Sequence, residues 1–412
     1  MLRFQLRPSL LLISATLLSM LQPPLFAAVL APPATPVVID AGTHGVTPDD
    51  GLDDAAALQS ILDSQSPGRP LVIRLPAGKL DFQRGLSIGR SDVTLEGAGD
   101  DKTEIVSHLS REDADSVIAI AGGKGVRVAM LGADAGRQDL SLQLSGRPVL
   151  QKGDYLLLRE PNDAAFLQQI GAIRWNREYP YLRQAMVRVD GVSQNRVSIA
   201  AATGVRFDAA QTQVYLLQPV RNVTLRSFGM RQLVPGADIA PLAQVYENSY
   251  PDYEVDEIAL NWTAGVRLEQ LRLLAAGSHP IAVNDSYGTH IRRVLIDGAW
   301  NKGKKGNGYL RLERSYYGLV SDVTVLNIRH IAIQWSSAFN LLEKIRANVD
   351  INFHGGYAHD NRVLAPHLVI PPGHPWPPVY RTPDDAHWAP PDGPGNEVTE
   401  LNTSSPPGAA GW

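Results

Sequence analysis

Alternating apolar and polar residues recur at a nearly regular spacing in the C-terminal half of this 412-residue chain. Five segments superpose so that their first and third residues are apolar and their second and fourth residues are mostly polar or small. Because successive side chains of a strand point to opposite faces, each segment is predicted to be a short strand whose first and third residues point inward. The segment starts lie 20 to 29 residues apart, about one coil of a parallel β-helix. The segments are Ile258–Trp262, Ile281–Asp285, Leu310–Arg314, Ile331–Trp335 and Ile351–Gly355.

Stacking these strands in register would place equivalent residues about 4.8 Å apart, in columns on the outer face. We call these columns the strip. The small alanines of one column leave room for a ligand, and the other columns offer polar groups with aromatic edges. The fourth positions are Asn261, Asn284, Glu313, Gln334 and His354, and the second positions are Ala259, Ala282, Arg311, Ala332 and Asn352. Beside them run Trp262, Asp285, Arg314 and Trp335.

The N-terminal part combines one short helix with several short strands. Residues 37–40 and 71–75 are apolar runs typical of strands, and between them Ala55 to Leu62 has helical apolar spacing. Asp53 or Asp54 is the expected N-cap of that helix. A strand, a helix and then evenly spaced strands predict a β-solenoid whose first coil is covered by the helix.

Three runs in this region resemble a known family: VVIDAGTHGVTPDDGLDDAAALQSILD from residue 37, VIRLPAGKLDF from residue 72 and VTLEGAGDDKTEI from residue 93. Together they resemble the start of the pectate lyase-like β-helix superfamily, in the branch of phage tailspike depolymerases, epimerases and polysaccharide lyases. The resemblance implies an all-β fold, a single-stranded right-handed parallel β-helix with an N-terminal capping helix. It also implies a carbohydrate ligand.

The chain is predicted to contain further segments around the solenoid. Residues 1–28 have the pattern of a signal peptide, with Arg3 and Arg7 before an apolar run, which predicts a secreted or periplasmic protein. An uncleaved N-terminal anchor is the alternative, and no later segment has the length of a membrane span. The β-helix is expected over residues 37–370, with a β-rich insertion at about 146–217 and a Pro-rich C-terminal tail over 371–412.

The insertion and the tail both carry aromatic residues whose role the sequence leaves open. In the insertion, Trp175, Tyr179 and Tyr181 lie among several arginines. They either pack the insertion onto the solenoid or contact sugars. The tail, with Trp376 and Trp388, either covers the open core or narrows the binding groove.

Composition restricts the classes of partner. There is no cysteine, so neither a disulfide framework nor a thiolate metal site is available. The formal net charge is -4, which argues against nucleic-acid binding because nucleic-acid-binding domains usually carry a basic excess. A polysaccharide, in particular an anionic one, is the partner we expect. The oligomeric state does not follow from the sequence.

The strip contains the residue types that β-elimination of a uronic acid requires. Asn284, Gln334, Arg311 and Arg314 can neutralise the sugar carboxylate, and His354 is the preferred base because neutral imidazole exchanges a proton near pH 7. A histidine in a polar ladder is the structural alternative. Further candidates are Lys302 and Lys304 in a glycine-rich loop as bases, and Tyr316 or Tyr317 as the acid.

Hydrolysis would use two carboxyl groups instead, and Glu313 and Asp285 lie on adjacent coils. Metal binding stays unresolved: Asn284, Asp285, Glu313 and Asn352 are oxygen ligands suited to Ca²⁺, but no sequential ligand loop appears. The residues predicted to bind substrate are Asn261, Asn284, Asp285, Arg314, Gln334, Trp335, Asn352 and Lys304.

Three functions fit these predictions. The first is an exported enzyme that cleaves an acidic polysaccharide by β-elimination. The second is a glycoside hydrolase or C5-epimerase on the same scaffold, and the third is a non-catalytic protein of glycan binding or exopolysaccharide assembly. Because one fold hosts all three, the site must decide between them.

Overall fold

The computed structural model describes residues 35–172, 174–175, 179–237, 247–303 and 306–404. All of them belong to the compact unit Thr35–Trp412. The predicted signal peptide and Lys304 lie outside the described residues. Within the described part of the chain, no helix is long and apolar enough to cross a membrane.

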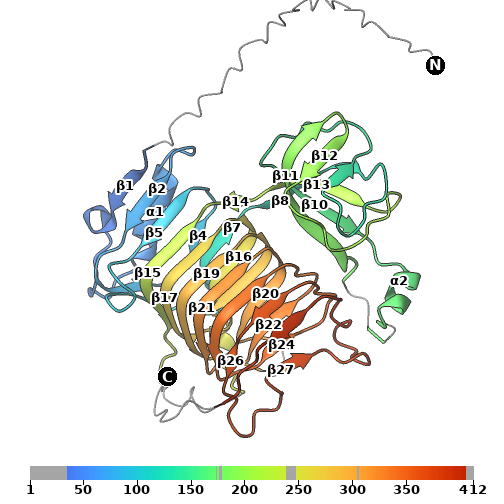
Figure 1. The fold of residues 1–412 in the computed structure, drawn as a ribbon. Coiled ribbons are helices and arrows are strands. Elements are labelled where there is room, and N and C mark those ends of the chain that lie inside the picture. Colours follow the sequence, from blue (N-terminus) through green and yellow to red (C-terminus); the bar gives the residue numbers. More distant parts are fainter. Residues whose placement is uncertain (1–34, 173, 176–178, 238–246, 304–305, 405–412) are drawn as a thin grey trace, which may run out of the picture. The chain divides into compact units, whose positions relative to one another are not determined.

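Two long parallel sheets form the solenoid, and their strands stack side by side along it (Figure 1). This confirms the predicted all-β, right-handed parallel β-helix. The first sheet has the order β1 (Val37–Asp40), β2 (Leu71–Arg74), β5 (Val93–Glu96), β15 (Thr224–Gln232), β17 (Arg267–Ala276), β19 (His290–Ala299), β21 (Leu319–Leu326), β23 (Leu341–Ala347), β25 (Arg362–Leu364) and β28 (Glu397–Thr399). Strands β3 (Gly78–Phe82), β6 (Thr103–Ser107) and β26 (His367–Leu368) also pair in it.

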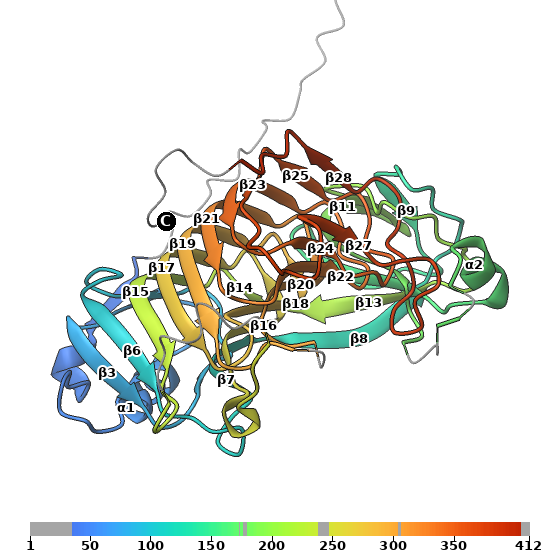
Figure 2. The same ribbon diagram turned by 90° about the horizontal axis from the view of Figure 1, so that it is seen from below.

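The second sheet carries the strip. Its order is β27 (Val379–Arg381), β24 (Ile351–Phe353), β22 (His330–Gln334), β20 (Tyr309–Tyr316), β18 (Ile281–Tyr287), β16 (Asp256–Ala264), β7 (Ser116–Ala121) and β4 (Leu86–Ile88), with β14 (Val220–Arg221) beside β16. The predicted register is confirmed, because Ile258 pairs with Ile281, Ile281 with Leu310, Leu310 with Ile331 and Ile331 with Ile351. The strands of this sheet are seen from below in Figure 2.

A bend follows the fourth position of each strip strand. Trp262, Asp285, Arg314 and Trp335 have left-handed backbones, with φ of 52°, 44°, 46° and 49°. The pairing of neighbouring strands omits this position: Asn261 pairs with Asn284, and the next pair is Thr263 with Ser286. Left-handed φ is uncommon for residues other than glycine and reverses the simple alternation of side chains. The bend therefore ends the flat part of the strip, which the alternation alone did not predict.

The core of the solenoid is a single apolar column made of the inward positions. Ile258, Leu260, Ile281 and Val283 are completely buried in it. Burying one such side chain stabilises the fold by roughly 1.5–3 kcal/mol. The stacked inward residues therefore hold successive coils together without any disulfide.

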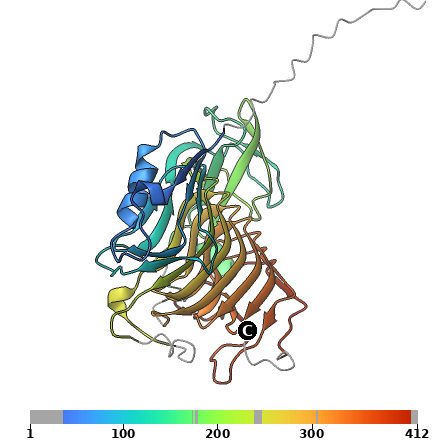
Figure 3. The same cartoon turned by 90° about the vertical axis from the view of Figure 1, so that its left-hand side faces the viewer.

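Helix α1 (Ala55–Ser64) lies beside the first strands, after a short 3-10 helix over Ala41–His44 (Figure 3). Its residues Ala55, Leu58, Ile61 and Leu62 join the solenoid core, so the predicted helical face is buried as expected. Asp54 occupies the N-cap position but does not cap with its side chain, which instead accepts hydrogen bonds from the backbone of Thr47 and Asp81. That the helix closes the open end of the solenoid stays a prediction.

The insertion is an antiparallel sheet with its own core. The strand order is β8 (Gly123–Met130), β13 (Gln213–Gln218), β10 (Tyr155–Glu160), β11 (Arg183–Ser193), β12 (Arg196–Ile199) and β9 (Ser141–Gln143), and helix α2 spans Ala164–Gln169. The sheet thus begins at Gly123, earlier than the predicted boundary at residue 146. Many residues of β8 are exposed or half-buried, so its sequence lacks the alternation that marks the later strands.

The Pro-rich tail adds to the solenoid. Strand β27 pairs with β24, and β28 pairs with β25, so both sheets continue into residues that the sequence suggested to be an extended covering segment. A short 3-10 helix, Pro251–Tyr253, precedes β16.

Candidate functional site

A further column of residues precedes the strip strands. The residue before each repeat falls on the outward positions of the alternation, but all five of these residues are buried. This column contains a carboxylic acid, an aromatic ring, a histidine and a second carboxylic acid. Its members are Glu257, Pro280, Tyr309, His330 and Asp350. Continuing the alternation backwards by one residue would have found them.

An ion network lies at the centre of the strip. Arg314 donates to Asp285 over 2.9 Å from Nε and also pairs with Glu313 through Nη1. Glu313 accepts a 2.9 Å hydrogen bond from Gln334, and the Nε of Arg311 lies 3.8 Å from its second oxygen. The structure therefore brings five of the predicted residues, from three neighbouring coils, into one connected cluster.

The two carboxyl groups of this cluster differ in their pKa. Burial raises the pKa of Asp285, and the Arg314 guanidinium opposes this only in part. Burial acts on Glu313 as well, but Arg314 and Arg311 together prevail and lower its pKa. Glu313 is thus ionised at neutral pH, while Asp285 takes up a proton more readily than an ordinary aspartate.

The insertion supplies the wall beside the ion network. Tyr179 lies 5.6 Å from the Trp335 ring and 5.5 Å from the Arg314 guanidinium, and Trp175 packs at 5.9 Å from Trp335. Trp175 is 4% exposed, which favours packing over sugar contact for this residue. Tyr179 is half-buried at the edge of the strip, so packing is shown for it and sugar contact stays a prediction.

Two more cations reach the network from the insertion. Arg159 on β10 adds to the opposition that Arg314 makes to the raised pKa of Asp285, and Lys124 on β8 is close enough to interact with Arg159 and Asp285. Arg159 also lies 4.2 Å above the ring of Tyr181. Four cationic side chains therefore act on the two carboxyl groups, Arg311 and Arg314 on Glu313, and Arg314, Arg159 and Lys124 on Asp285, although the whole chain has a net charge of -4.

At the N-terminal side of the strip, Arg311 contacts a buried histidine. Its Nη1 lies 2.9 Å from Nε2 of His279, and burial lowers the pKa of His279 well below its usual value, so the ring is neutral. Asp256 accepts a 3.0 Å hydrogen bond from the His279 backbone, and burial raises its pKa to about 6 despite the nearby Arg311. Asp256 therefore changes charge close to physiological pH.

At the other end of the strip, His354 lies beside Tyr309 and His330, with ring centroids 5.9 and 6.3 Å away. Burial lowers the pKa of His354 to about 4, and the neighbouring His330 adds to the effect. His330 itself bonds to Asp350 over 2.7 Å, and Asn352 donates to the second oxygen of Asp350 over 3.1 Å. His354 is thus a neutral imidazole at pH 7.

Two predicted catalytic residues lie in positions that do not support their roles. Lys302 is 1% exposed and its ammonium donates to the Asn327 carbonyl over 2.6 Å, in the turn between β21 and β22. Tyr316 is 2% exposed and packs with Leu157 and Met186 of the insertion. Their burial disfavours Lys302 as the base and Tyr316 as the acid, and both roles stay predictions. Their burial arises from the turn and the insertion, which the repeat pattern does not describe.

The remaining predicted residues lie on the strip with different accessibility. Asn261 is exposed, whereas Asn284 and Gln334 are 8% and 7% exposed. Asn352 is 1% exposed and donates a hydrogen bond to Asp350. The suggested calcium ligands Asp285 and Glu313 bind Arg314 instead. Among the described residues, no group of three or more His, Asp or Glu side chains is placed to hold a metal ion.

Comparison with known proteins bears on the fold. No family model matches the chain, and no curated protein matches it. Similar solved structures include a tailspike of Acinetobacter baumannii bacteriophage AP22 in complex with capsular saccharide, with a TM-score of 0.48 and 10% identity over 80% of this chain and 54% of that one. A tailspike of Pseudomonas phage phi297 has a TM-score of 0.46 and 12% identity over 81% of this chain and 64% of that one.

A third similar structure is a pectin methylesterase from Erwinia chrysanthemi, with a TM-score of 0.38 and 8% identity over 89% of this chain and 90% of that one. The chain spans less than two thirds of the length of either tailspike. The parallel sheets of this chain agree with the fold that the resemblance to the pectate lyase-like β-helix superfamily implied.

Proposed function

We propose that this protein binds an acidic polysaccharide along the strip and cleaves it by β-elimination. The observation that carries the proposal is the cluster of Arg311, Arg314, Arg159 and Lys124 around the ionised Glu313 and the carboxyl group of Asp285. A local excess of cations in a chain of net negative charge concentrates anionic ligands at that place.

In the proposed reaction, His354 removes the proton from C5 of a uronic acid. The electron pair of the C5–H bond forms a C4–C5 double bond, and the C4–O bond breaks with its pair on the leaving oxygen, which takes up a proton. Arg311 or Arg314 neutralises the sugar carboxylate and so makes the C5 proton more acidic. Burial lowers the pKa of His354 to about 4, so the imidazole is unprotonated and can accept a proton at neutral pH, but it is a weaker base than an ordinary histidine.

Hydrolysis is the second candidate, and one observation favours it. Asp285 and Glu313 lie on adjacent coils, with the pKa of Asp285 raised and that of Glu313 lowered. A glycosidase needs such a pair, one carboxyl group as acid and one carboxylate as nucleophile or base.

A panel of alginate, polygalacturonate and neutral dextran tests the proposal. Elimination gives an ultraviolet absorbance from the new conjugated double bond, whereas hydrolysis gives reducing ends without that absorbance. We expect absorbance with a uronic polymer and none with dextran. Reducing ends alone, with loss of turnover in Glu313→Gln, would establish hydrolysis, and binding without either product would establish a non-catalytic glycan-binding protein.

His354→Ala should abolish the absorbance change while leaving the circular dichroism spectrum intact. His44→Ala serves as the matched control, since His44 is exposed on the 3-10 helix before α1. Full turnover by His354→Ala would remove His354 as the base.

We further propose that the protein is exported, on the basis of the N-terminal pattern of residues 1–28. Expression of the full chain followed by N-terminal sequencing of the product outside the cytoplasm tests this. A product that retains the first residues would favour the anchor.

A further inference from the structure

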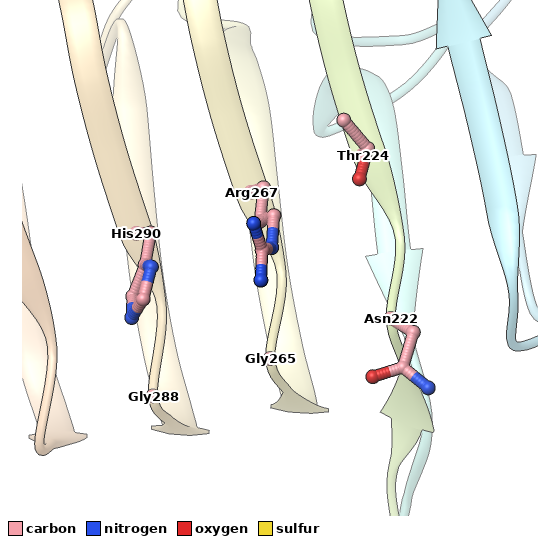
Figure 4. Close-up of a pocket in the computed structure, with 6 residues that line it drawn as sticks. All are labelled: Asn222, Thr224, Gly265, Arg267, Gly288 and His290. Atoms are coloured by element: carbon pink, nitrogen blue, oxygen red, sulfur yellow. The ribbon is translucent and has the colours of Figure 1, made fainter.

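A polar pocket separate from the strip lies where the strip strands turn into the first sheet, as Figure 4 shows. It has a volume of about 320 Å³. Three consecutive coils contribute equivalent residues to it, so it runs along the solenoid rather than into it. The lining residues are Asn222, Thr224, Gly265, Arg267, Gly288 and His290.

The hollow arises from the backbone of the turn. Gly265 and Gly288 have left-handed φ of 67° and 65°, and Asn222 takes the same conformation at 55°. A Cβ added at Gly288 would meet no atom within 4 Å, so open space begins directly at the backbone. After the turn, Thr224 pairs with Arg267 and Arg267 pairs with His290. Their side chains stand on three neighbouring strands beside the hollow (Figure 4).

Arginines dominate the charge around this pocket. Arg267 is exposed at its centre, and Arg221 is exposed immediately before Asn222. Arg188 on β11 of the insertion and Arg221 both lie near Tyr155. Burial raises the pKa of Tyr155, and the two guanidinium groups oppose that rise. Two carboxylates are also near. Asp92 accepts a 2.8 Å hydrogen bond from Asn222. Glu269 lies close enough to His290 to raise its pKa, against the lowering effect of Arg292. The cations outnumber the anions.

Half-buried tyrosines border the same corner. Tyr155 of the insertion packs against Tyr287 of the solenoid at 5.4 Å, and Tyr287 precedes Gly288 in the chain. Together they offer an aromatic edge beside the arginines. Such a combination of guanidinium groups and aromatic rings suits a sugar that carries an acidic group.

One insertion strand connects the neighbourhood of the pocket with the strip. Tyr155 begins β10 and packs on Tyr287, the residue before Gly288 of the pocket, and Arg159 on the same face of β10 interacts with Asp285 of the strip. Four residues of extended strand span roughly 13 Å. One polymer chain is long enough to occupy both places, whereas a single sugar is not.

We propose that this corner pocket, lined by Arg267 and the turn of Asn222, Gly265 and Gly288 with the exposed Arg221 next to it, is a second binding site for an acidic polysaccharide. The substrate class rests on the proposed function. The pocket holds the polymer outside the strip, so it raises the affinity for long chains without taking part in bond cleavage.

The test compares Arg221→Ser/Arg267→Ser with the matched control Arg147→Ser/Arg346→Ser, which removes two exposed arginines elsewhere. Each full-length protein is run in native gels containing alginate or polygalacturonate, and KM and kcat are measured on any polymer that wild type cleaves. We expect the pocket variant to bind about tenfold more weakly and to show a raised KM with unchanged kcat. The control should match wild type.

The outcomes separate this inference from the proposed function. Retardation that is lost in the pocket variant supports the second site even where no polymer is cleaved. Wild-type retardation and KM in the pocket variant, with turnover intact, overturn the second site alone. No binding and no turnover of any uronic polymer by wild type overturn both.

Discussion

Glu257 is the most unusual single residue of the strip. Its side chain is completely buried, and neither carboxylate oxygen has a hydrogen-bond partner among the described residues. Burial raises its pKa well above the usual value, so the group is protonated over a wide pH range. An unpartnered buried carboxyl group costs stability, because it gives up its hydrogen bonds to water without replacement.

Replacing Glu257 with Gln should stabilise the fold, increasingly so as the pH rises. The folded pKa lies above the unfolded value of 4.5, so the folded state holds the proton more tightly and wild type loses stability as pH rises through that window. Gln cannot ionise and carries no such loss. Urea unfolding at about pH 5 and about pH 8 should show a gain of about 1 kcal/mol or more at the higher pH. Glu112→Gln, at an exposed position, should show no gain at either pH.

At the scale of the element, a ladder of buried asparagines ties the last coils together. Asn361 accepts hydrogen bonds of 3.1 and 2.8 Å from the backbone and side chain of Asn340, and donates over 2.9 Å to Asn396. Asn340 in turn donates over 2.8 Å to the Ser315 carbonyl. Each side chain forms hydrogen bonds with backbone groups of a neighbouring coil. Parallel strand pairing alone would leave these groups without partners at the turns.

Asn361→Ala should therefore be strongly destabilising. The substitution leaves several buried donors and acceptors without partners, each costing roughly 1–3 kcal/mol, so the expected loss is about 3 kcal/mol or more. Thermal and urea unfolding measure the loss. Asn261→Ala is the matched control, since Asn261 is exposed, and a similar loss in both variants would contradict the ladder.

The whole molecule combines a negative net charge with a local cluster of cations at the strip. If the arginine cluster of the strip attracts the ligand, salt should weaken binding, because the Debye length falls from about 10 Å at 0.1 M to about 3 Å at 1 M. We expect the dissociation constant for a uronic polymer to rise several-fold between these salt concentrations. Titration by fluorescence measures it, and an affinity that does not change with salt would exclude an electrostatic basis for binding.

How far the sequence predicts this protein depends on the range of the interactions involved. The strand register and the connection of Asp285, Glu313 and Arg314 followed from periodicity, because alternation and stacking are local rules repeated in every coil. The burial of Lys302 and Tyr316 could not be predicted, for the opposite reason. Their environments come from the turn after β21 and from the insertion, which lie far away in the sequence.

The sequence by itself determined the solenoid, its inward and outward faces and most of the strip, since each rests on the two-residue period of a strand. Only the tertiary structure decided which polar residues are buried and which carry charge. The insertion brings Arg159, Lys124 and Tyr179 beside the strip, and left-handed corners end it at Trp262 and its equivalents. Burial and electrostatic pairing depend on neighbours from distant coils, so no local pattern contains them.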